Sequence, residues 1–172
     1  NLFIASTHDY ILFFTDMGKV YWLKVYDIPN ASRIAKGRAI VNLLELDKDE
    51  NVTSTIPVRK FDDRQLVMAT RNGIIKKTVL SAFGRPKKGG IISILLDSGD
   101  KLIGVKLTTG GQEIVLGTEN GKAIRFSEDD VRCMGRATRG VKGIGLKGDD
   151  KVKGIVVVDK NATLLTVCEN GF

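Results

Sequence analysis

The stretch Leu66-Val-Met-Ala-Thr-Arg-Asn-Gly-Ile-Ile-Lys-Lys-Thr-Val79 places two apolar runs on either side of Arg71-Asn72-Gly73. Asn-Gly supplies the positive φ angles of a tight hairpin turn, so the stretch predicts antiparallel strands over residues 66–70 and 74–79. The same pattern occurs three more times, with turns at Asp16-Met17-Gly18, Glu119-Asn120-Gly121 and Glu169-Asn170-Gly171. The turn glycines are spaced by 55, 48 and 50 residues, which indicates an array of similar units.

The remainder of each unit repeats as well. A basic, glycine-bearing loop follows each complete hairpin, and we call residues 33–38, 85–90 and 136–143 the first, second and third basic loops. Each loop runs into two more apolar runs, which predict further strand pairs: 40–46 with 52–58, 91–96 with 102–107, and 144–146 with 153–158. Acidic turns join the members of each pair. Four short strands at a period near fifty residues are typical of a propeller blade.

These repeats predict an all-β, propeller-like fold with residues 1–172 as one domain. It should contain about three complete four-stranded blades, approximately over residues 8–61, 62–109 and 110–158, and a partial blade over 159–172. A lone strand is expected over residues 2–6. Three units are too few to close a ring, so we expect an arc of a larger array, with an open stack of hairpins as the alternative.

Composition favours a polyanionic partner. The chain has 27 Lys and Arg against 20 Asp and Glu, a net charge of +7 and a pI near 9.5. Nucleic acid is the first candidate, an anionic membrane surface the second, and a solvated basic surface without a partner the third. The apolar runs are too short to span a bilayer. Cys133 and Cys168 lie far apart in the sequence and are expected to be buried apolar residues in a reducing cytoplasm.

The sequence offers little for catalysis. His8 is the single histidine, so sites that combine thiols or carboxylates with histidine, or bind zinc, cannot be assembled. Residues 143–148 match G-x-G-x-x-G, but a predicted strand follows them where dinucleotide binding requires a helix N-terminus. No G-x-x-x-x-G-K-[ST] phosphate loop is present. We therefore expect no catalytic site, cofactor or metal within this chain.

Positive charge recurs at two places in each unit. The basic loops contribute Lys36, Arg38, Arg85, Lys87, Lys88, Arg136, Arg139 and Lys142. The strands after the hairpin turns contribute Lys19, Lys24, Lys76, Lys77, Lys122 and Arg125. On blades arranged around an axis, these series would trace a curved basic stripe that contacts DNA phosphates without reading bases. The alternative is that they are ordinary solvated loop cations.

Four stretches carry a family resemblance. Residues 35–44 (A-K-G-R-A-I-V-N-L-L), 72–78 (N-G-I-I-K-K-T), 102–105 (L-I-G-V) and 131–136 (V-R-C-M-G-R) resemble the C-terminal domain of bacterial DNA gyrase A. The resemblance implies a β-pinwheel of about six hairpin blades that binds, bends and wraps double-stranded DNA. It further implies a bacterial cytoplasmic A₂B₂ assembly, formed with the rest of gyrase A and with gyrase B, which binds ATP and Mg²⁺ elsewhere and introduces negative supercoils.

Two departures from the family pattern leave alternatives open. The family's Q-R-R-G-G-K-G stretch is absent; by register it should precede Asn1, and its nearest likeness, residues 85–90 (R-P-K-K-G-G), lies in another blade. The family's DNA-cleaving tyrosine follows an arginine, whereas no tyrosine here does, so cleavage is expected outside this chain. One alternative is the C-terminal domain of the topoisomerase IV A-type protein. The other is a propeller-type protein-interaction platform, which the 6% aromatic content disfavours.

Overall fold

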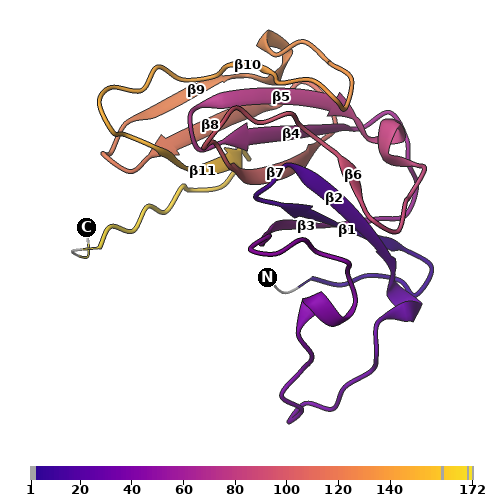
Figure 1. Cartoon of the computed structure of the whole chain (residues 1–172). Helices are drawn as coiled ribbons and strands as arrows, with labels where there is room; N and C mark the ends of the chain where they lie inside the picture. Colours follow the sequence, from indigo (N-terminus) through magenta and orange to yellow (C-terminus); the bar gives the residue numbers. More distant parts are fainter. Residues whose placement is uncertain (1–2, 160, 170, 172) are drawn as a thin grey trace.

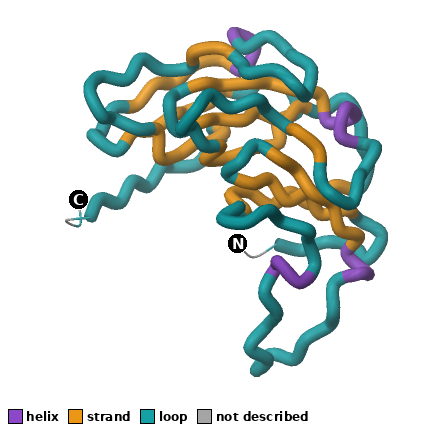
Figure 2. Tube along the Cα trace, in the orientation of Figure 1, coloured by secondary structure: helices purple, strands orange, loops and turns teal. Residues whose placement is uncertain are grey.

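The computed structural model describes residues 3–159, 161–169 and 171, and these are built almost entirely from strands and loops (Figure 2). The strands are β1 (Tyr10–Thr15), β2 (Lys19–Lys24), β3 (Val52–Val58), β4 (Gln65–Thr70), β5 (Ile74–Val79), β6 (Ile91–Ile92), β7 (Leu102–Thr108), β8 (Glu113–Thr118), β9 (Ala123–Ser127), β10 (Val141–Lys142) and β11 (Val152–Val157). Four 3-10 turns accompany them: η1 (Val25–Asp27), η2 (Ile40–Asn42), η3 (Leu80–Phe83) and η4 (Glu128–Asp130). Within the described ranges, no helix is long and apolar enough to cross a membrane.

The described strands form three antiparallel sheets, ordered β3-β1-β2-β6, β10-β5-β4-β7 and β11-β8-β9, which we call the first, second and third sheets (Figure 1). Each is built on one predicted hairpin, β1–β2, β4–β5 or β8–β9. In each, the strand after the acidic turn, β3, β7 or β11, pairs with the first arm of the hairpin of its own unit. The three predicted hairpins are therefore confirmed.

The fourth strand of a sheet comes from the next unit. Ile91 and Ile92 pair with Val20 and Lys19, and β10 pairs with β5 in the same way. The predicted pairing of each post-loop run with its following neighbour is therefore wrong. Residues 40–46 contain η2 and no strand, and residues 144–146 contain none either. The physical reason is that the open edges of β2 and β5 offer unpaired amides and carbonyls where the basic loop of the next unit ends.

The core lies between the sheets. One cluster joins the first and second sheets through Leu12, Phe14, Leu66 and Met68, among others. A second joins the second and third sheets, and it includes Val67 and Ala69. Successive residues of β4 therefore face opposite clusters, as the alternation of a strand requires. Because β4 is buried on both faces, the second sheet is the centre of the array.

The predicted terminal strands are not formed. Residues 3–6 adopt no strand, and Leu2 lies outside the described residues. Residues 164–168 form no strand either, and Leu165 is 83% exposed; Asn170 and Phe172 of the same copy lie outside the described residues. An apolar run becomes a strand only where a ladder partner is available, and none is present among the described residues. The two cysteines are exposed, which corrects the expectation that they are buried.

Candidate nucleic-acid interface

The turn glycines anchor the basic loops of the following unit. The Gly18 carbonyl accepts hydrogen bonds from the amides of Ser93 (2.8 Å) and Ile94 (3.2 Å), just after the second basic loop. The Gly73 carbonyl accepts the equivalent pair, from Gly143 (2.8 Å) and Ile144 (3.3 Å). The second and third loops are thereby fixed along the outer edges of the first and second sheets.

The second basic loop leaves η3 and crosses onto the first sheet. Its cations Arg85, Lys87 and Lys88 are all exposed. Lys88 Nζ lies 2.8 Å from a carboxylate oxygen of Glu45 in the previous unit, and this ion pair raises the pKa of Lys88. Gly90 packs so closely on the Tyr21 ring that a Cβ there would lie 2.8 Å from a ring carbon. The loop therefore rests on the first sheet with its charged side chains exposed.

The third basic loop lies over the segment that leaves β6. The Thr138 carbonyl accepts the Leu95 amide at 3.0 Å, and the Arg136 guanidinium donates to the Ile92 carbonyl at 3.3 Å. Arg139 forms a 3.0 Å ion pair with Asp97. Arg139 and Lys142 are exposed, whereas Arg136 is partly buried. Residues 91–97 directly follow the second loop and contact the third loop. The two loops therefore follow one another along the outer edge of the array.

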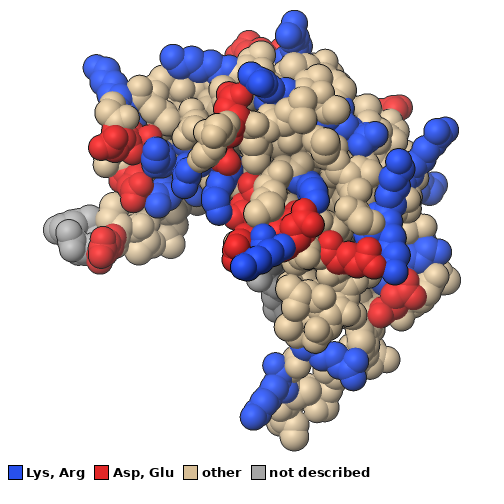
Figure 3. All heavy atoms as spheres, viewed as in Figure 1, with Lys and Arg blue, Asp and Glu red and all other residues tan. Residues whose placement is uncertain are grey.

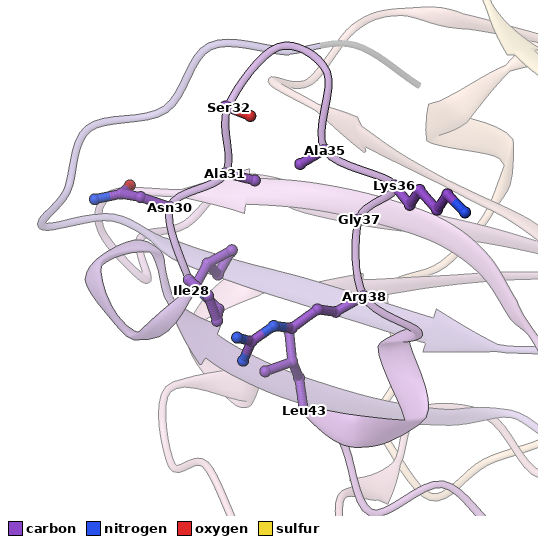
Figure 4. Close-up of a pocket in the computed structure, with 10 residues that line it drawn as sticks. Ile28, Asn30, Ala31, Ser32, Ala35, Lys36, Gly37, Arg38 and Leu43 are labelled. Carbon is purple, nitrogen blue, oxygen red and sulfur yellow. The ribbon is translucent and has the colours of Figure 1, made fainter.

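The first basic loop differs from the other two because it projects from the first sheet (Figure 1), and residues 29–39 are all exposed. It encloses a hollow lined by residues 28–32, residues 35–38 and Leu43. Figure 4 shows Arg38 reaching into this hollow towards Leu43, while Lys36 points away from it. Both cations are present on the surface, but no sheet supports their loop.

The hairpin cations of the first and third units differ in their contacts. Lys19 forms an ion pair with Asp47, and Arg125 with Glu113. Lys24 lies over the rings of Tyr10 and Tyr26, 5.5 and 5.2 Å from their centroids. Lys122 is exposed. Within the described part of the chain, the predicted cations without an ion pair, a ring contact or a side-chain hydrogen bond are Lys36, Arg38, Arg85, Lys87, Lys122 and Lys142.

The sequence predicts Lys76 and Lys77 on the basic stripe, but the structure places both inside. Lys76 is 0% exposed and Lys77 is 9% exposed. The Lys77 ammonium donates to the Glu128 carbonyl at 2.7 Å, and the Lys76 ammonium is likewise held by backbone carbonyls. The second-sheet edge that carries them is covered by β10 and the third basic loop. Neither ammonium is free for a phosphate.

An acid at the same place in each unit has a structural role that the sequence reasoning missed. Asp100 accepts the Asn72 amide at 2.9 Å, and Asp150 accepts the Asn120 amide at 3.0 Å, so each caps a hairpin turn. Burial opposes ionisation of Asp150, but hydrogen bonds from Asn120 and its neighbours keep its pKa below the usual range. Glu50 instead binds the hydroxyls of Thr15 and Tyr21. The signal in the sequence is an acid that recurs every fifty residues.

The charges of the surface suit the binding of a polyanion. Figure 3 shows Lys and Arg side chains spread along the outer margin of the array and on the projecting loop, with acidic groups between them. Among the described residues, no cluster of three His, Cys, Asp or Glu side chains could hold a metal ion. Cations on successive outer loops can contact a line of phosphates.

Comparisons with known proteins agree with this architecture. A sequence model of the DNA gyrase C-terminal domain, a β-propeller, matches residues 9–59, 64–109 and 112–159. The DNA gyrase A protein of Salmonella typhimurium is 49% identical over 99% of this chain and 20% of its own length. The Escherichia coli K12 protein is 47% identical over the same shares. The chain therefore spans about a fifth of the length of these relatives.

Solved structures show the same fold. The C-terminal domain of DNA topoisomerase IV has a TM-score of 0.84 at 31% identity, over 90% of this chain and 48% of that one. A DNA gyrase A C-terminal domain has a TM-score of 0.74 at 26% identity, over 91% and 50%. The all-β, propeller-like β-pinwheel expected from the sequence is thus confirmed. On the match of three successive repeats to one sequence model, the chain belongs to the family of DNA gyrase C-terminal β-propeller domains.

Proposed function

We propose that this chain binds duplex DNA without sequence preference and bends it around its outer edge, as the DNA-wrapping part of DNA gyrase. The observation that carries the proposal is the placement of the second and third basic loops. Each is anchored to a turn glycine of the preceding hairpin, and each exposes cations along the same edge. Contacts from such loops fall on phosphates, which position a duplex without specifying its bases.

The family supports roles for the remaining parts of the assembly. The relatives are DNA gyrase A proteins, and the chain covers about a fifth of their length. We propose that the rest of gyrase A and the gyrase B protein join it in an A₂B₂ assembly in the bacterial cytoplasm. Those parts would bind ATP and Mg²⁺ and cleave DNA, and this chain would bind and bend the DNA.

A salt titration with a mixed-sequence linear duplex tests the binding. Each phosphate contact contributes about 0.9 to the slope of log K against log salt, so four contacts predict a slope near −3.6. Replacing Arg85 and Lys87 by alanine should reduce the steepness of that slope by up to about 1.8, equally for all sequences. A matched control replaces Lys106 and Lys153, which lie on β7 and β11, the sheet edges opposite β10 and β9.

The control pair should leave the slope unchanged although it removes the same charge. An equal loss in both variants would show that only net charge matters, and it would remove the loops from the proposed interface. A flat salt dependence of the unaltered chain would instead favour a protein-interaction platform, because a polar protein interface releases few counterions.

The topoisomerase IV alternative rests on one observation, the higher TM-score of that C-terminal domain. Curated relatives at 47–49% identity are gyrase A proteins, and they favour gyrase. Relaxation of a closed plasmid in the presence of the chain separates the two. Chiral wrapping leaves a linking-number change of one sign after the protein is removed, whereas simple bending leaves none.

A further inference from the structure

The residues equivalent to Lys76 in the first and third units carry no charge. Counted from the turn glycines, Lys76 corresponds to Tyr21 in the first unit and Ile124 in the third. Its side chain is 0% exposed in the middle of β5. Burial, and then the neighbouring Arg136 guanidinium, lower the pKa of Lys76 to about 8. A buried ammonium without a carboxylate partner is costly, so packing alone would favour an apolar residue here.

The Lys76 ammonium is fully paired with backbone carbonyls. It donates to Ser93 at 2.7 Å, to Thr138 at 3.3 Å and to Arg136. An ammonium has three donors and no acceptor, so the three carbonyls match it completely. Two of them belong to the third basic loop, and the third belongs to the segment beneath that loop. The side chain therefore ties the loop to the second sheet from inside.

The other attachments of this part of the loop are near the surface. The Thr138 carbonyl also accepts the Leu95 amide, the Arg136 guanidinium donates to the Ile92 carbonyl at the surface, and the Arg139 ion pair with Asp97 is exposed. Surface ion pairs contribute little and weaken in salt, whereas charge-assisted hydrogen bonds inside a protein are shorter and stronger. Loss of the Lys76 contacts would leave residues 136–139 held mainly by the weaker attachments.

We propose that Lys76 is a positioning residue that holds the third basic loop in the conformation in which Arg139 and Lys142 face DNA, without itself touching DNA. The inference rests on the proposed DNA binding. It assigns to a buried lysine of the predicted basic stripe a role that acts through the loop above it. The structure gives the equivalent residues Tyr21 and Ile124 no such contacts, so among the described units only the second has a lysine that holds the loop of the next unit in this way.

The variant Lys76→Met tests the role because methionine keeps the approximate volume without the charge. We expect the fold to be retained, affinity for a mixed-sequence duplex at pH 7 to fall about three- to tenfold, and the salt slope to lose up to about 1.8. Hydrogen exchange at the Leu95 amide, which donates to this loop, should accelerate. Lys77→Met is the matched control, since Lys77 is buried on the same strand but contacts Glu128. It should leave affinity, slope and Leu95 exchange unchanged.

A pH series separates positioning from general stability. The folded-state pKa of Lys76, about 8, lies below its ordinary value of 10.5, so the unfolded state binds more protons between those values. Its contribution to folding stability therefore rises with pH over this window, while the neutral amine loses one donor to the loop. The unaltered chain should lose DNA affinity between pH 7 and 9 without losing stability, and Lys76→Met should show no such loss.

The neighbouring charges do not mimic this profile. The loop and segment that pack on Lys76 carry Arg136, Arg139, Lys142 and Asp97, β4 has no titratable residue, and β5 adds Lys77. Arginines and carboxylates do not ordinarily titrate between pH 7 and 9, and every one of these groups is common to the chain and the variant. A difference between the two pH profiles therefore reports on Lys76.

The outcomes are distinct. If Lys76→Met binds DNA with the affinity and pH profile of the unaltered chain, the inference is overturned while the proposed function stands. If the unaltered chain does not bind duplex DNA at low salt, both fail together. If Lys76→Met does not fold, Lys76→Gln keeps two donors and takes its place, with the pH profile of the unaltered chain as the second measurement.

Discussion

β5 and β9 hold equivalent positions in two successive units, but β5 is buried and β9 is exposed. β5 is covered by β10, and its central residues are buried. β9 is an edge of the third sheet among the described strands, and Ile124 and Arg125 are exposed. Lys77 and Arg125 hold equivalent positions, yet one donates to a buried carbonyl and the other lies on the surface. The difference comes from β10 of the third unit, which pairs with β5, whereas no described strand pairs with the outer edge of β9.

The pair shows what a repeat position can and cannot predict. Position within the unit fixes the strand, its partner in the hairpin and the direction of its side chains. Exposure depends on the segment that the following unit lays over that strand. A cation in a repeated motif is therefore a candidate for binding only where no later segment covers it.

Substitutions of the turn glycines before β5 and β9 should give the largest difference in stability between the two strands. Gly73 has φ of +85°, and a Cβ there would lie 2.9 Å from Ile144 Cγ2 and 3.0 Å from its carbonyl oxygen. Gly121 has φ of +79° and nothing within 4 Å. Gly73→Ala should lower the free energy of unfolding by about 2 to 5 kcal/mol, and Gly121→Ala by only about 1 to 2 kcal/mol. Urea denaturation measures both, and equal losses would contradict the covered-edge explanation.

Substitutions of the equivalent cations Lys77 and Arg125 should give the next largest difference in stability. Lys77→Met removes a buried charge-assisted hydrogen bond to the Glu128 carbonyl, which keeps only the Val131 amide as a donor. The variant should lower the free energy of unfolding by about 1 to 3 kcal/mol. Arg125→Met removes an exposed ion pair and should not change stability measurably. Thermal unfolding of the two variants provides the comparison. A destabilised Arg125→Met protein would mean that β9 is as well buried as β5 in solution.

The exposed cations beside β9 should also contribute to DNA binding. Replacing Lys122 and Arg125 by alanine should reduce the salt slope by up to about 1.8, since both are exposed beside the third sheet. Titration of the duplex with this variant measures the effect. Because Lys77→Met carries a charge loss at the covered position, its unchanged slope is the reference. A slope that stays the same in both variants would exclude β9 from the interface.

The smallest effect concerns the acids that oppose the basic loops. Glu45 pairs with Lys88, and Asp97 pairs with Arg139, so DNA phosphates compete with these carboxylates. Glu45→Gln combined with Asp97→Asn should raise duplex affinity about threefold more than a control with the same charge change, Asp63→Asn with Asp149→Asn. Both control acids are exposed. Equal gains would indicate a general charge effect and no local competition.

Much of the candidate site could be predicted from the sequence, because its loops follow recognisable hairpins. Arg85, Lys87 and Lys142 are exposed on loops that the glycine and charge pattern identified. Lys76 and Lys77 could not be placed in this way. Their alternation along β5 is visible in the sequence, but the carbonyls that receive their ammonium groups lie 17 to 62 residues away.

The sequence by itself determined the hairpins, the period of the units and the family. Turn glycines and strand alternation act over a few residues, so local backbone geometry leaves few alternatives. Only the tertiary structure decided which strand completes each sheet and which cations stay in water. β6 and β10 each pair with the hairpin of the preceding unit, some seventy residues earlier along the chain, and their short runs do not encode that choice. The choice depends on an open strand edge and a buried cluster that exist only once neighbouring units are packed together.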